Sequence, residues 1–131
     1  MFAALCDDDK YITEEIKKLL LEYAKDNRIT IDIDEFESGE ELLNSEKNYD
    51  IIVLDYQLGS TNGLTVAKKL RKRNVLSCVI FLTSYPQFMI DAFEVNTFRF
   101  LLKPIDKSKF FKAIDDYIKI RCKLSDNHHS K

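Results

Sequence analysis

Four apolar stretches of this sequence end in side chains that could bind a cation and a phosphoryl group. The first is followed by the aspartates at positions 7–9, the second by Asp55, the third by Thr83 and the fourth by Lys103. Clustered carboxylates repel one another unless a cation joins them, and such a set of hard oxygen ligands suits Mg²⁺. A hydroxyl and an ammonium beside the cation could hold an incoming phosphoryl group.

Each of these residues also has an ordinary structural explanation. Aspartates 7–9 and Asp55 can cap a turn or a helix, Thr83 is a common strand residue, and Lys103 can be a surface charge. Their occurrence together at the ends of four apolar stretches favours one shared site over four separate explanations.

The strands that must position these residues are marked by their apolar pattern. Residues 51–54, IIVL, and residues 78–83, CVIFLT, are continuous runs, typical of strands buried on both faces of a parallel sheet. Residues 29–36 alternate apolar with polar side chains, which indicates a half-buried edge strand. In open α/β sheets ligands bind at the carboxyl ends of the strands, which is where Asp55 stands.

Strand and helix patterns alternate five times along the chain. The expected strands cover residues 2–6, 29–36, 51–55, 78–83 and 98–102, and the expected helices residues 10–27, 38–43, a segment after Gly63, 86–93 and 106–122. Ser38 and Glu41 form a capping box, and Pro86 suits the first position of a helix. Because right-handed crossovers place helices on both faces of a parallel sheet, we predict an α/β fold. The expected form is a flavodoxin-like (βα)5 three-layer sandwich with a five-stranded parallel sheet in the order 2-1-3-4-5.

Length and composition limit the size and the partners of the protein. The 131 residues, 45% hydrophobic and 32% charged, suit one domain, expected over residues 1–122, with residues 123–131 as a polar tail or the start of a linker. The net charge of −2 argues against direct nucleic acid binding by this segment. We expect a cytoplasmic location and no membrane contact, because there is no signal peptide and no apolar run of ~18 residues. The three cysteines lack the spacing of a disulfide framework or a zinc site.

Four motifs at the strand ends resemble those of the CheY-like receiver domain of two-component response regulators. They are ALCDDD at residues 4–9, IIVLDYQLGSTNG at 51–63, FLTS at 81–84 and FRFLLKP at 98–104. The resemblance covers residues 1–122 and implies a domain that takes a phosphoryl group from a histidine kinase and switches its surface to control an output. It implies a signalling phosphoacceptor rather than an enzyme.

The resemblance also assigns the metal and the acceptor. Asp55 would be the phosphoacceptor and would form an aspartyl phosphate. Mg²⁺ would be bound by Asp8, by Asp55 and by the backbone carbonyl of Gln57, with Asp7 acting through a water molecule.

Three further residues would hold the phosphoryl group and respond to it. Thr83 would hydrogen-bond the group and shift toward it, Lys103 would pair with its oxygens, and Phe100 would rotate inward on activation. Phe100 replaces the common tyrosine, so this switch has no hydroxyl. Gly59 stands where many receivers have proline, which predicts a more mobile loop.

A narrower resemblance concerns the output. Residues 92–105, AFEVNTFRFLLKPI, resemble the receivers that precede LytTR-type DNA-binding domains. This implies transcription regulation through a C-terminal DNA-binding domain of the full-length protein. A homodimer that forms on phosphorylation is a further expectation from the family.

Three other classes fit the residues less well. A phosphohydrolase of the haloacid dehalogenase type needs a second carboxylate two residues after its nucleophile, where this chain has Gln57. A nucleotide-binding domain needs a glycine-rich phosphate loop, and Gly39, Gly59 and Gly63 are too few and too dispersed to form one. A degenerate receiver that serves only as an interaction module is disfavoured by the complete set of acceptor residues.

Two finer predictions concern the turn after Lys103 and the loss of the phosphoryl group. Lys103 must point back toward the acids while the chain turns into the next helix, and an X-Pro bond can turn sharply in the cis form at a cost of only ~0.5–1 kcal/mol. We therefore expect a cis Lys103–Pro104 bond, which the resemblance also implies. Gln57 and Tyr85, two residues beyond Asp55 and Thr83, are expected to tune dephosphorylation. Neither is a general base near neutral pH, so slow loss of the phosphoryl group is expected.

Overall fold

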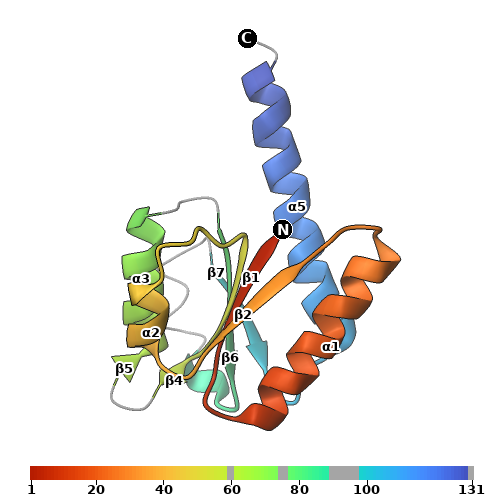
Figure 1. Cartoon of the computed structure of the whole chain (residues 1–131). Coiled ribbons are helices and arrows are strands. Elements are labelled where there is room, and N and C mark those ends of the chain that lie inside the picture. The colour runs from red at the N-terminus through yellow and green to blue at the C-terminus, as the bar shows by residue number, and fades with distance from the viewer. Residues whose placement is uncertain (59–60, 74–76, 89–97, 130–131) are drawn as a thin grey trace.

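A five-stranded parallel sheet forms the centre of the molecule (Figure 1). The computed structural model describes residues 1–58, 61–73, 77–88 and 98–129. The strands of this sheet are β1 (Phe2–Cys6), β2 (Asp32–Phe36), β3 (Ile51–Asp55), β6 (Cys78–Thr83) and β7 (Phe98–Leu102). They lie in the order β2-β1-β3-β6-β7, which confirms the predicted order 2-1-3-4-5.

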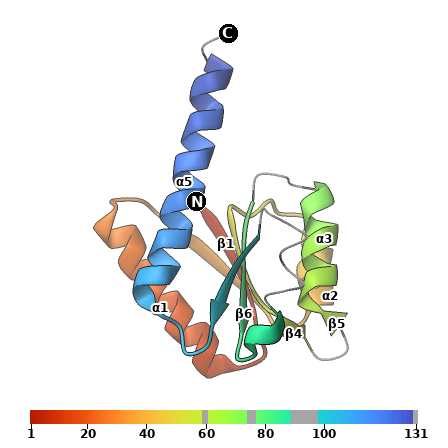
Figure 2. The same cartoon turned by 180° about the vertical axis from the view of Figure 1, so that it is seen from behind.

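Helices cover both faces of this sheet (Figures 1 and 2). One face carries α1 (Lys10–Asp26) and α5 (Lys107–His129), and the other carries α2 (Gly39–Asn44) and α3 (Gly63–Arg73). Successive residues of a strand point to opposite faces, so each face has its own apolar core. Leu5 and Val53 belong to the core under α1 and α5, whereas Cys6 and Leu54 belong to the core under α2 and α3. The three-layer sandwich is confirmed.

The edge strand β2 begins later than its alternating pattern predicts. The pattern starts at Ile29, but the strand starts at Asp32. Arg28 has a positive φ of 54°, and the Ile29 amide donates to the carbonyl of Ala24 at 2.9 Å, so these residues still close the end of α1. The predicted start was wrong because the helix end uses residues that also fit the strand pattern.

Side-chain caps fix where α1 and α2 begin. The carboxylate of Asp9, which precedes α1, accepts the amide of Tyr11 at 2.9 Å. The hydroxyl of Ser38 accepts the amide of Glu41 at 3.2 Å, and the Glu41 carboxylate accepts the amide of Glu37 at 3.2 Å. The predicted capping box is confirmed, with its return bond one residue earlier than in the usual motif.

The two C-terminal helices differ from expectation in their extent. Of the helix expected over residues 86–93, the structure describes a 3-10 helix, η1 (Pro86–Phe88), and residues 89–93 lie outside the described residues. The helix α5 ends at His129 rather than near Cys122, so the predicted end of this helix was wrong. Residues 123–129 contain neither glycine nor proline, and nothing in their sequence stops a helix. As Figures 1 and 2 show, α5 extends well beyond the sheet.

No helix in the described ranges has both the length and the apolar character needed to cross a membrane.

Candidate functional site

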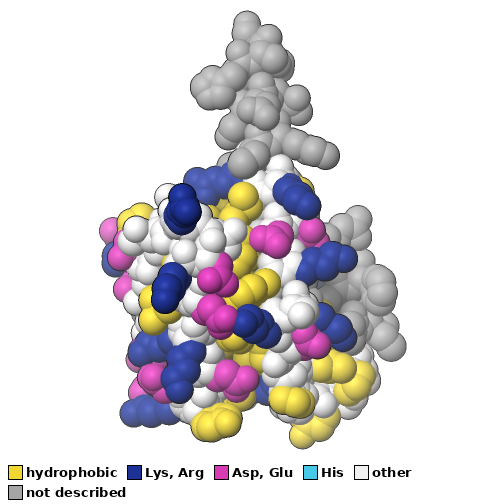
Figure 3. Space-filling model, turned by 90° about the vertical axis from the view of Figure 1, so that its right-hand side faces the viewer, with side chains coloured by type: hydrophobic (Ala, Val, Ile, Leu, Met, Phe, Trp, Pro, Cys, Tyr) yellow, Lys and Arg dark blue, Asp and Glu magenta, His cyan; other side chains and the backbone are white. Residues whose placement is uncertain are grey.

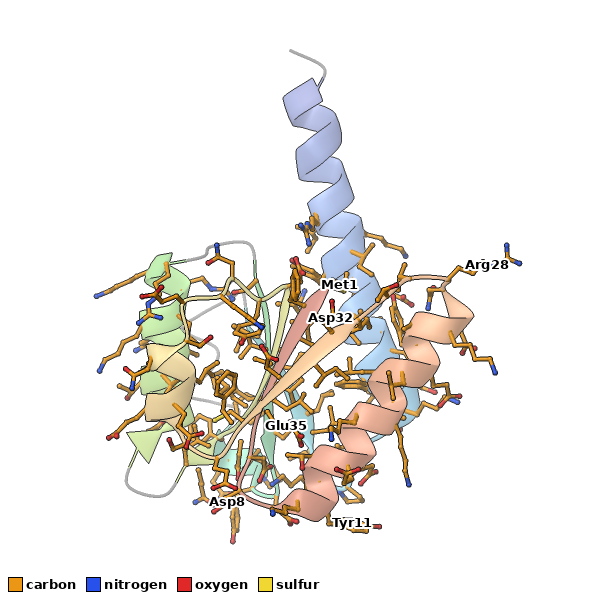
Figure 4. The ribbon with its side chains drawn as sticks, viewed as in Figure 1. Met1, Asp8, Tyr11, Arg28, Asp32 and Glu35 are labelled. Atoms are coloured by element: carbon orange, nitrogen blue, oxygen red, sulfur yellow. The ribbon has the colours of Figure 1, made fainter. Side chains whose placement is uncertain are left out.

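The residues selected for their chemistry meet at the carboxyl edge of the sheet. Asp8 lies where β1 ends, at the lower end of the sheet in Figure 4. Asp55 is the last residue of β3, Thr83 is the last residue of β6, and Lys103 directly follows β7. Because β1, β3, β6 and β7 are neighbours in the parallel sheet, their ends form one continuous edge.

Three carboxylates lie close enough together to share a cation. Asp7, Asp8 and Asp55 each offer one oxygen, and these three oxygens lie within 4.8 Å of one another. Asp7 is buried, Asp55 is partly buried and Asp8 is exposed, so the group opens to solvent on one side. An all-oxygen, triply acidic group of this kind fits a hard divalent cation such as Mg²⁺.

Asp9 does not join this group, although it directly follows Asp7 and Asp8. Its carboxylate caps α1 through the amide of Tyr11. Its own amide donates to Oδ1 of Asp7 at 2.9 Å, which fixes the orientation of the buried carboxylate. The structural explanation therefore holds for Asp9, and the chemical explanation fits Asp7 and Asp8.

Lys103 reaches the acidic group from the other side of the sheet edge. Its Nζ lies 3.2 Å from Oδ2 of Asp7 and 3.6 Å from Oδ2 of Asp55. Burial lowers the pKa of Lys103, but the carboxylates of Asp55 and Asp7 raise it more, so its pKa lies above the ordinary value. The ammonium therefore remains charged at neutral pH and can compensate the two acids or pair with an incoming anion. The bond between Lys103 and Pro104 is cis, as predicted.

The carboxylate of Asp55 is held in place by its own loop. Its Oδ1 accepts the backbone amide of Gln57 at 3.1 Å, while its Oδ2 faces Lys103. Burial raises the pKa of Asp55, the charge of Asp7 adds to this rise, and the contacts with Gln57 and Lys103 oppose it without cancelling it. A cation beside Asp55 would favour its charged form, which is the nucleophilic one.

Thr83 brings a buried hydroxyl to the same edge. Its side chain is only 2% exposed, and its Oγ1 accepts the backbone amide of Tyr85 at 3.1 Å. The carbonyl of Thr83 accepts the amide of Lys103 at 2.8 Å, which joins the ends of β6 and β7. Since the hydroxyl is the acceptor in its contact with Tyr85, its own hydrogen can be donated to a ligand.

The loop after Asp55 forms a small hairpin that the sequence did not reveal. Its strands are β4 (Gln57–Leu58) and β5 (Thr61–Asn62), and Gly59, between them, lies outside the described residues. Gly63 closes the loop by donating its amide to the carbonyl of Tyr56 at 2.8 Å. A Cβ at Gly63 would lie 2.7 Å from the carbonyl oxygen of Asp55, so only glycine fits without a shift of the backbone.

Both predicted tuning residues lie at the surface. Gln57 is exposed, and Tyr85 is 47% exposed. Their effect on dephosphorylation remains a prediction.

The thiol of Cys6 precedes the acids, but burial, with the charge of Asp7, raises its pKa to about 12. It is therefore a neutral core residue and not a nucleophile.

Phe100 packs against the core through two other aromatic residues. It is half-buried on β7, and its ring centroid lies 5.5 Å from that of Tyr56 and 5.4 Å from that of Phe81. The sequence suggested Phe100 but gave no role to Tyr56. The feature that could have revealed Tyr56 is an aromatic residue directly after the acid that ends an aliphatic run.

Comparisons with known proteins all lead to response regulators. A family described as the response regulator receiver domain matches residues 3–115. The sensory transduction protein LytT of Bacillus cereus is 34% identical over 120 residues, covering 91% of this chain and 48% of that protein. The transcriptional regulatory protein LytR of Staphylococcus aureus is 30% identical over 127 residues, covering 97% of this chain and 51% of that protein. The chain thus spans about half the length of these relatives.

Solved structures share the fold. The response regulatory domain of protein mrkE from Klebsiella pneumoniae has a TM-score of 0.78 at 20% identity, covering 92% of this chain and 97% of that chain. The response regulator protein TrrA from Thermotoga maritima, in complex with Mg²⁺ and BeF, has a TM-score of 0.74 at 26% identity, covering 88% of this chain and 97% of that chain.

Proposed function

The chain belongs to the response regulator receiver family, and we propose that Asp55 is its phosphoacceptor, taking a phosphoryl group from a histidine kinase in a reaction that requires Mg²⁺. One observation carries this proposal: the ammonium of Lys103 lies 3.6 Å from Asp55 and 3.2 Å from Asp7, beside a group of three carboxylates. The site would thus offer a nucleophile in Asp55, a fixed cation in Lys103 and carboxylate ligands for a second cation at one edge of the sheet.

The acidic group fits the proposed metal. Mg²⁺ would be held by Asp8 and Asp55, by the backbone carbonyl of Gln57 and, through water, by Asp7. When bound, it would neutralise phosphoryl charge opposite Lys103. Support for this metal comes from the donor set, which consists of carboxylate oxygens, and from the related TrrA structure, which is a complex with Mg²⁺ and BeF.

The residues of the chain then divide the work of phosphoryl transfer. A carboxylate oxygen of Asp55 attacks the phosphorus, a new O–P bond forms, and the P–N bond to the histidine of the kinase breaks, leaving its electron pair on the imidazole nitrogen. Lys103 pairs with a phosphoryl oxygen, and the hydroxyl of Thr83 donates to another. The hydrogen bond from Gln57 to Oδ1 keeps the Asp55 carboxylate in position during the attack.

We propose that the domain is a phosphoacceptor rather than an enzyme. Rapid hydrolysis of the aspartyl phosphate would need a general base near the attacking water. The side chain of Gln57 does not ionise, and a phenol such as that of Tyr85 is a poor general base at neutral pH. We therefore propose a slow loss of the phosphoryl group, which suits transcriptional control.

The output of the full-length protein is proposed to be transcription, through a DNA-binding domain of the LytTR type on the C-terminal side. Support comes from the LytT and LytR relatives, which are about twice as long as this chain. We divide the chain into a receiver over residues 1–122 and the start of a linker over 123–131, and α5 would continue helically into that linker.

Direct contact with nucleic acid is not proposed for this segment. On the side presented in Figure 3, basic and acidic side chains are interspersed, and the described residues there show no broad basic area. The net charge is −2. We propose that the protein interacts with a histidine kinase and that it forms a homodimer on phosphorylation. We also propose a cytoplasmic location, which the free thiols of Cys6 and Cys78 support.

Incubation with a small-molecule phosphodonor and Mg²⁺, followed by intact mass measurement, tests the proposal. The wild type should gain one phosphoryl group that alkali removes, and chelation should prevent the gain. Asp55→Asn should gain none. Asp9→Asn is the matched control, because Asp9 caps α1 outside the group and asparagine can also cap a helix. Labelling that persists in Asp55→Asn would show that another residue is the acceptor. No labelling of the wild type would indicate a domain that serves only as an interaction module.

A further inference from the structure

Tyr56 directly follows the proposed phosphoacceptor and is almost completely buried, with 3% of its surface exposed. We propose that Tyr56 is a positioning residue: its ring is the seat that holds Phe100 of β7 against the core and connects the position of Phe100 to the acceptor loop. A role of this seat in signalling rests on the proposed function, whereas the contact between Tyr56 and Phe100 does not depend on it.

The backbone of Tyr56 is fixed at both of its polar groups. Its amide donates to the carbonyl of Leu82 at 2.9 Å, and its carbonyl accepts the amide of Gly63 at 2.8 Å. The first bond joins the residue to β6 and the second to the start of α3. The ring of Tyr56 therefore projects from a backbone that cannot shift unless the acceptor loop also shifts.

The rings of Tyr56, Phe81 and Phe100 contact one another pairwise. Tyr56 meets Phe81 edge-on, at 5.6 Å between centroids and an interplanar angle of 72°. Phe100 meets both of them in tilted arrangements, at 43° to Tyr56 and 38° to Phe81. All three distances lie in the range in which aromatic pairs attract beyond simple burial.

Phe100 differs from the other two rings in its burial. Tyr56 is 3% exposed and Phe81 is fully buried, whereas Phe100 is only half-buried. Phe81 and Phe100 face each other across β6 and β7, so their contact is set by strand pairing. The contact with Tyr56 is different, because it connects β7 to the residue next to Asp55.

This arrangement makes the seat a link between two parts of the site. Lys103, which pairs with Asp55, follows Phe100 by three residues on the same segment. A change at Asp55 that displaces Tyr56 alters the contact surface offered to Phe100, and by reciprocity the position of Phe100 alters the free energy of that change. If Phe100 exchanges between an inward position against Tyr56 and an outward one, loss of one aromatic pair would change the ratio of outward to inward Phe100 by about two- to tenfold.

A single fluorophore can report this ratio, because the chain contains no tryptophan. Phe100→Trp would be measured by fluorescence lifetime and by quenching with acrylamide, without phosphodonor. Combining it with Tyr56→Leu should raise the ratio of exposed to buried lifetime components about two- to tenfold. Combining it with Tyr56→Phe, which keeps the ring, should leave the ratio unchanged. The comparison of leucine with phenylalanine separates the contribution of the ring from that of the hydroxyl, provided that both variants remain folded, and the double-variant cycle below separates the pairwise contact from the effect of lost volume.

A second measurement keeps the native Phe100. Tyr56→Leu, Phe100→Leu and the double variant would be compared by urea unfolding. The combined rise in the unfolding constant should fall short of the product of the two single effects by about two- to tenfold, because the first substitution already removes the shared contact. Two results would overturn the proposal. One is that the effects of Tyr56→Leu and Phe100→Leu on unfolding are independent. The other is that the exposed fraction of the introduced tryptophan does not change when Tyr56→Leu is added to folded Phe100→Trp. Intact mass after phosphodonor treatment is read separately, so failure of Asp55 to label would reject the proposed function without affecting the seat.

Discussion

Replacing Lys103 by methionine removes the ammonium that lies between Asp7 and Asp55 and keeps a side chain of similar length. In the absence of a divalent cation, this ammonium is the positive charge that directly contacts both acids among the described residues. We expect Lys103→Met to lower the free energy of unfolding without Mg²⁺ and to increase the stabilisation that Mg²⁺ provides.

The magnitude follows from the two distances and the burial. At 3.2 Å and 3.6 Å, and with an effective dielectric constant of about 20, each ion pair has a gross attraction of roughly 5 kcal/mol. The desolvation of Lys103 offsets much of this attraction. The exposed fractions of the side chains are 18% for Lys103, 3% for Asp7 and 14% for Asp55. The net loss should therefore lie between that of an exposed and that of a fully buried pair, at about 2 kcal/mol.

The response to Mg²⁺ has the opposite sign. Without Lys103 the three acids lose their fixed counter-charge, so the site becomes more negative and binds a cation more tightly. A gain of ~1.4 kcal/mol in binding free energy is a tenfold lower Kd, and binding to the folded state stabilises it by mass action. Saturating Mg²⁺ should therefore return most of the stability that the substitution removes.

Urea unfolding with chelator and with saturating Mg²⁺ measures both effects in wild type and variant. Lys47→Met is the matched control, because Lys47 pairs with Asp34 at 3.0 Å with 61% and 37% of the side chains exposed. It should change the free energy of unfolding by less than ~1 kcal/mol, independently of Mg²⁺. If Lys103→Met behaves like this control in chelator and gains no extra stability from Mg²⁺, then Lys103 does not compensate the acidic group.

Three further predictions concern the loop, the core and the lifetime of the phosphoryl group. Gly63→Ala should lower the free energy of unfolding by about 1–3 kcal/mol and slow phosphorylation, because the new Cβ would lie 2.7 Å from the carbonyl oxygen of Asp55. An unchanged urea unfolding curve would contradict this prediction. Burial raises the pKa of Cys78 from 9.0 to about 11, so the folded state holds the thiol proton more tightly, and stability that is complete below pH ~9 should be lost as pH rises toward ~11. Urea unfolding across this window should show a shallower fall in Cys78→Ala, and equal slopes would exclude the thiol as a cause. Tyr85→Ala should accelerate decay of phosphorylated protein at fixed Mg²⁺ by admitting water, and an equal decay rate would show that Tyr85 does not control access.

The sequence by itself determined the order of the strands and which residues meet at the carboxyl edge of the sheet. Continuous apolar runs identify β3 and β6 as central strands, because burial on both faces removes polar residues from them. The acid, hydroxyl and ammonium at Asp55, Thr83 and Lys103 stand directly at strand ends. Once a parallel sheet is inferred, these ends must meet at one edge, so the site follows from local patterns and one topological rule.

Tertiary structure alone decided which side chains contact one another and where several elements begin or end. The family resemblance assigned Asp7 and Asp8, but not Asp9, to the metal, and the structure supplies the physical reason. Asp9 caps α1 while Asp7 and Asp8 lie close to Asp55, because the turn into the helix directs each side chain differently. The pattern starting at Ile29 did not show that the end of α1 would occupy the first residues of the expected strand. The contact of Tyr56 with Phe100 joins residues far apart in the chain, and a periodic pattern records only burial, not which distant side chain provides it.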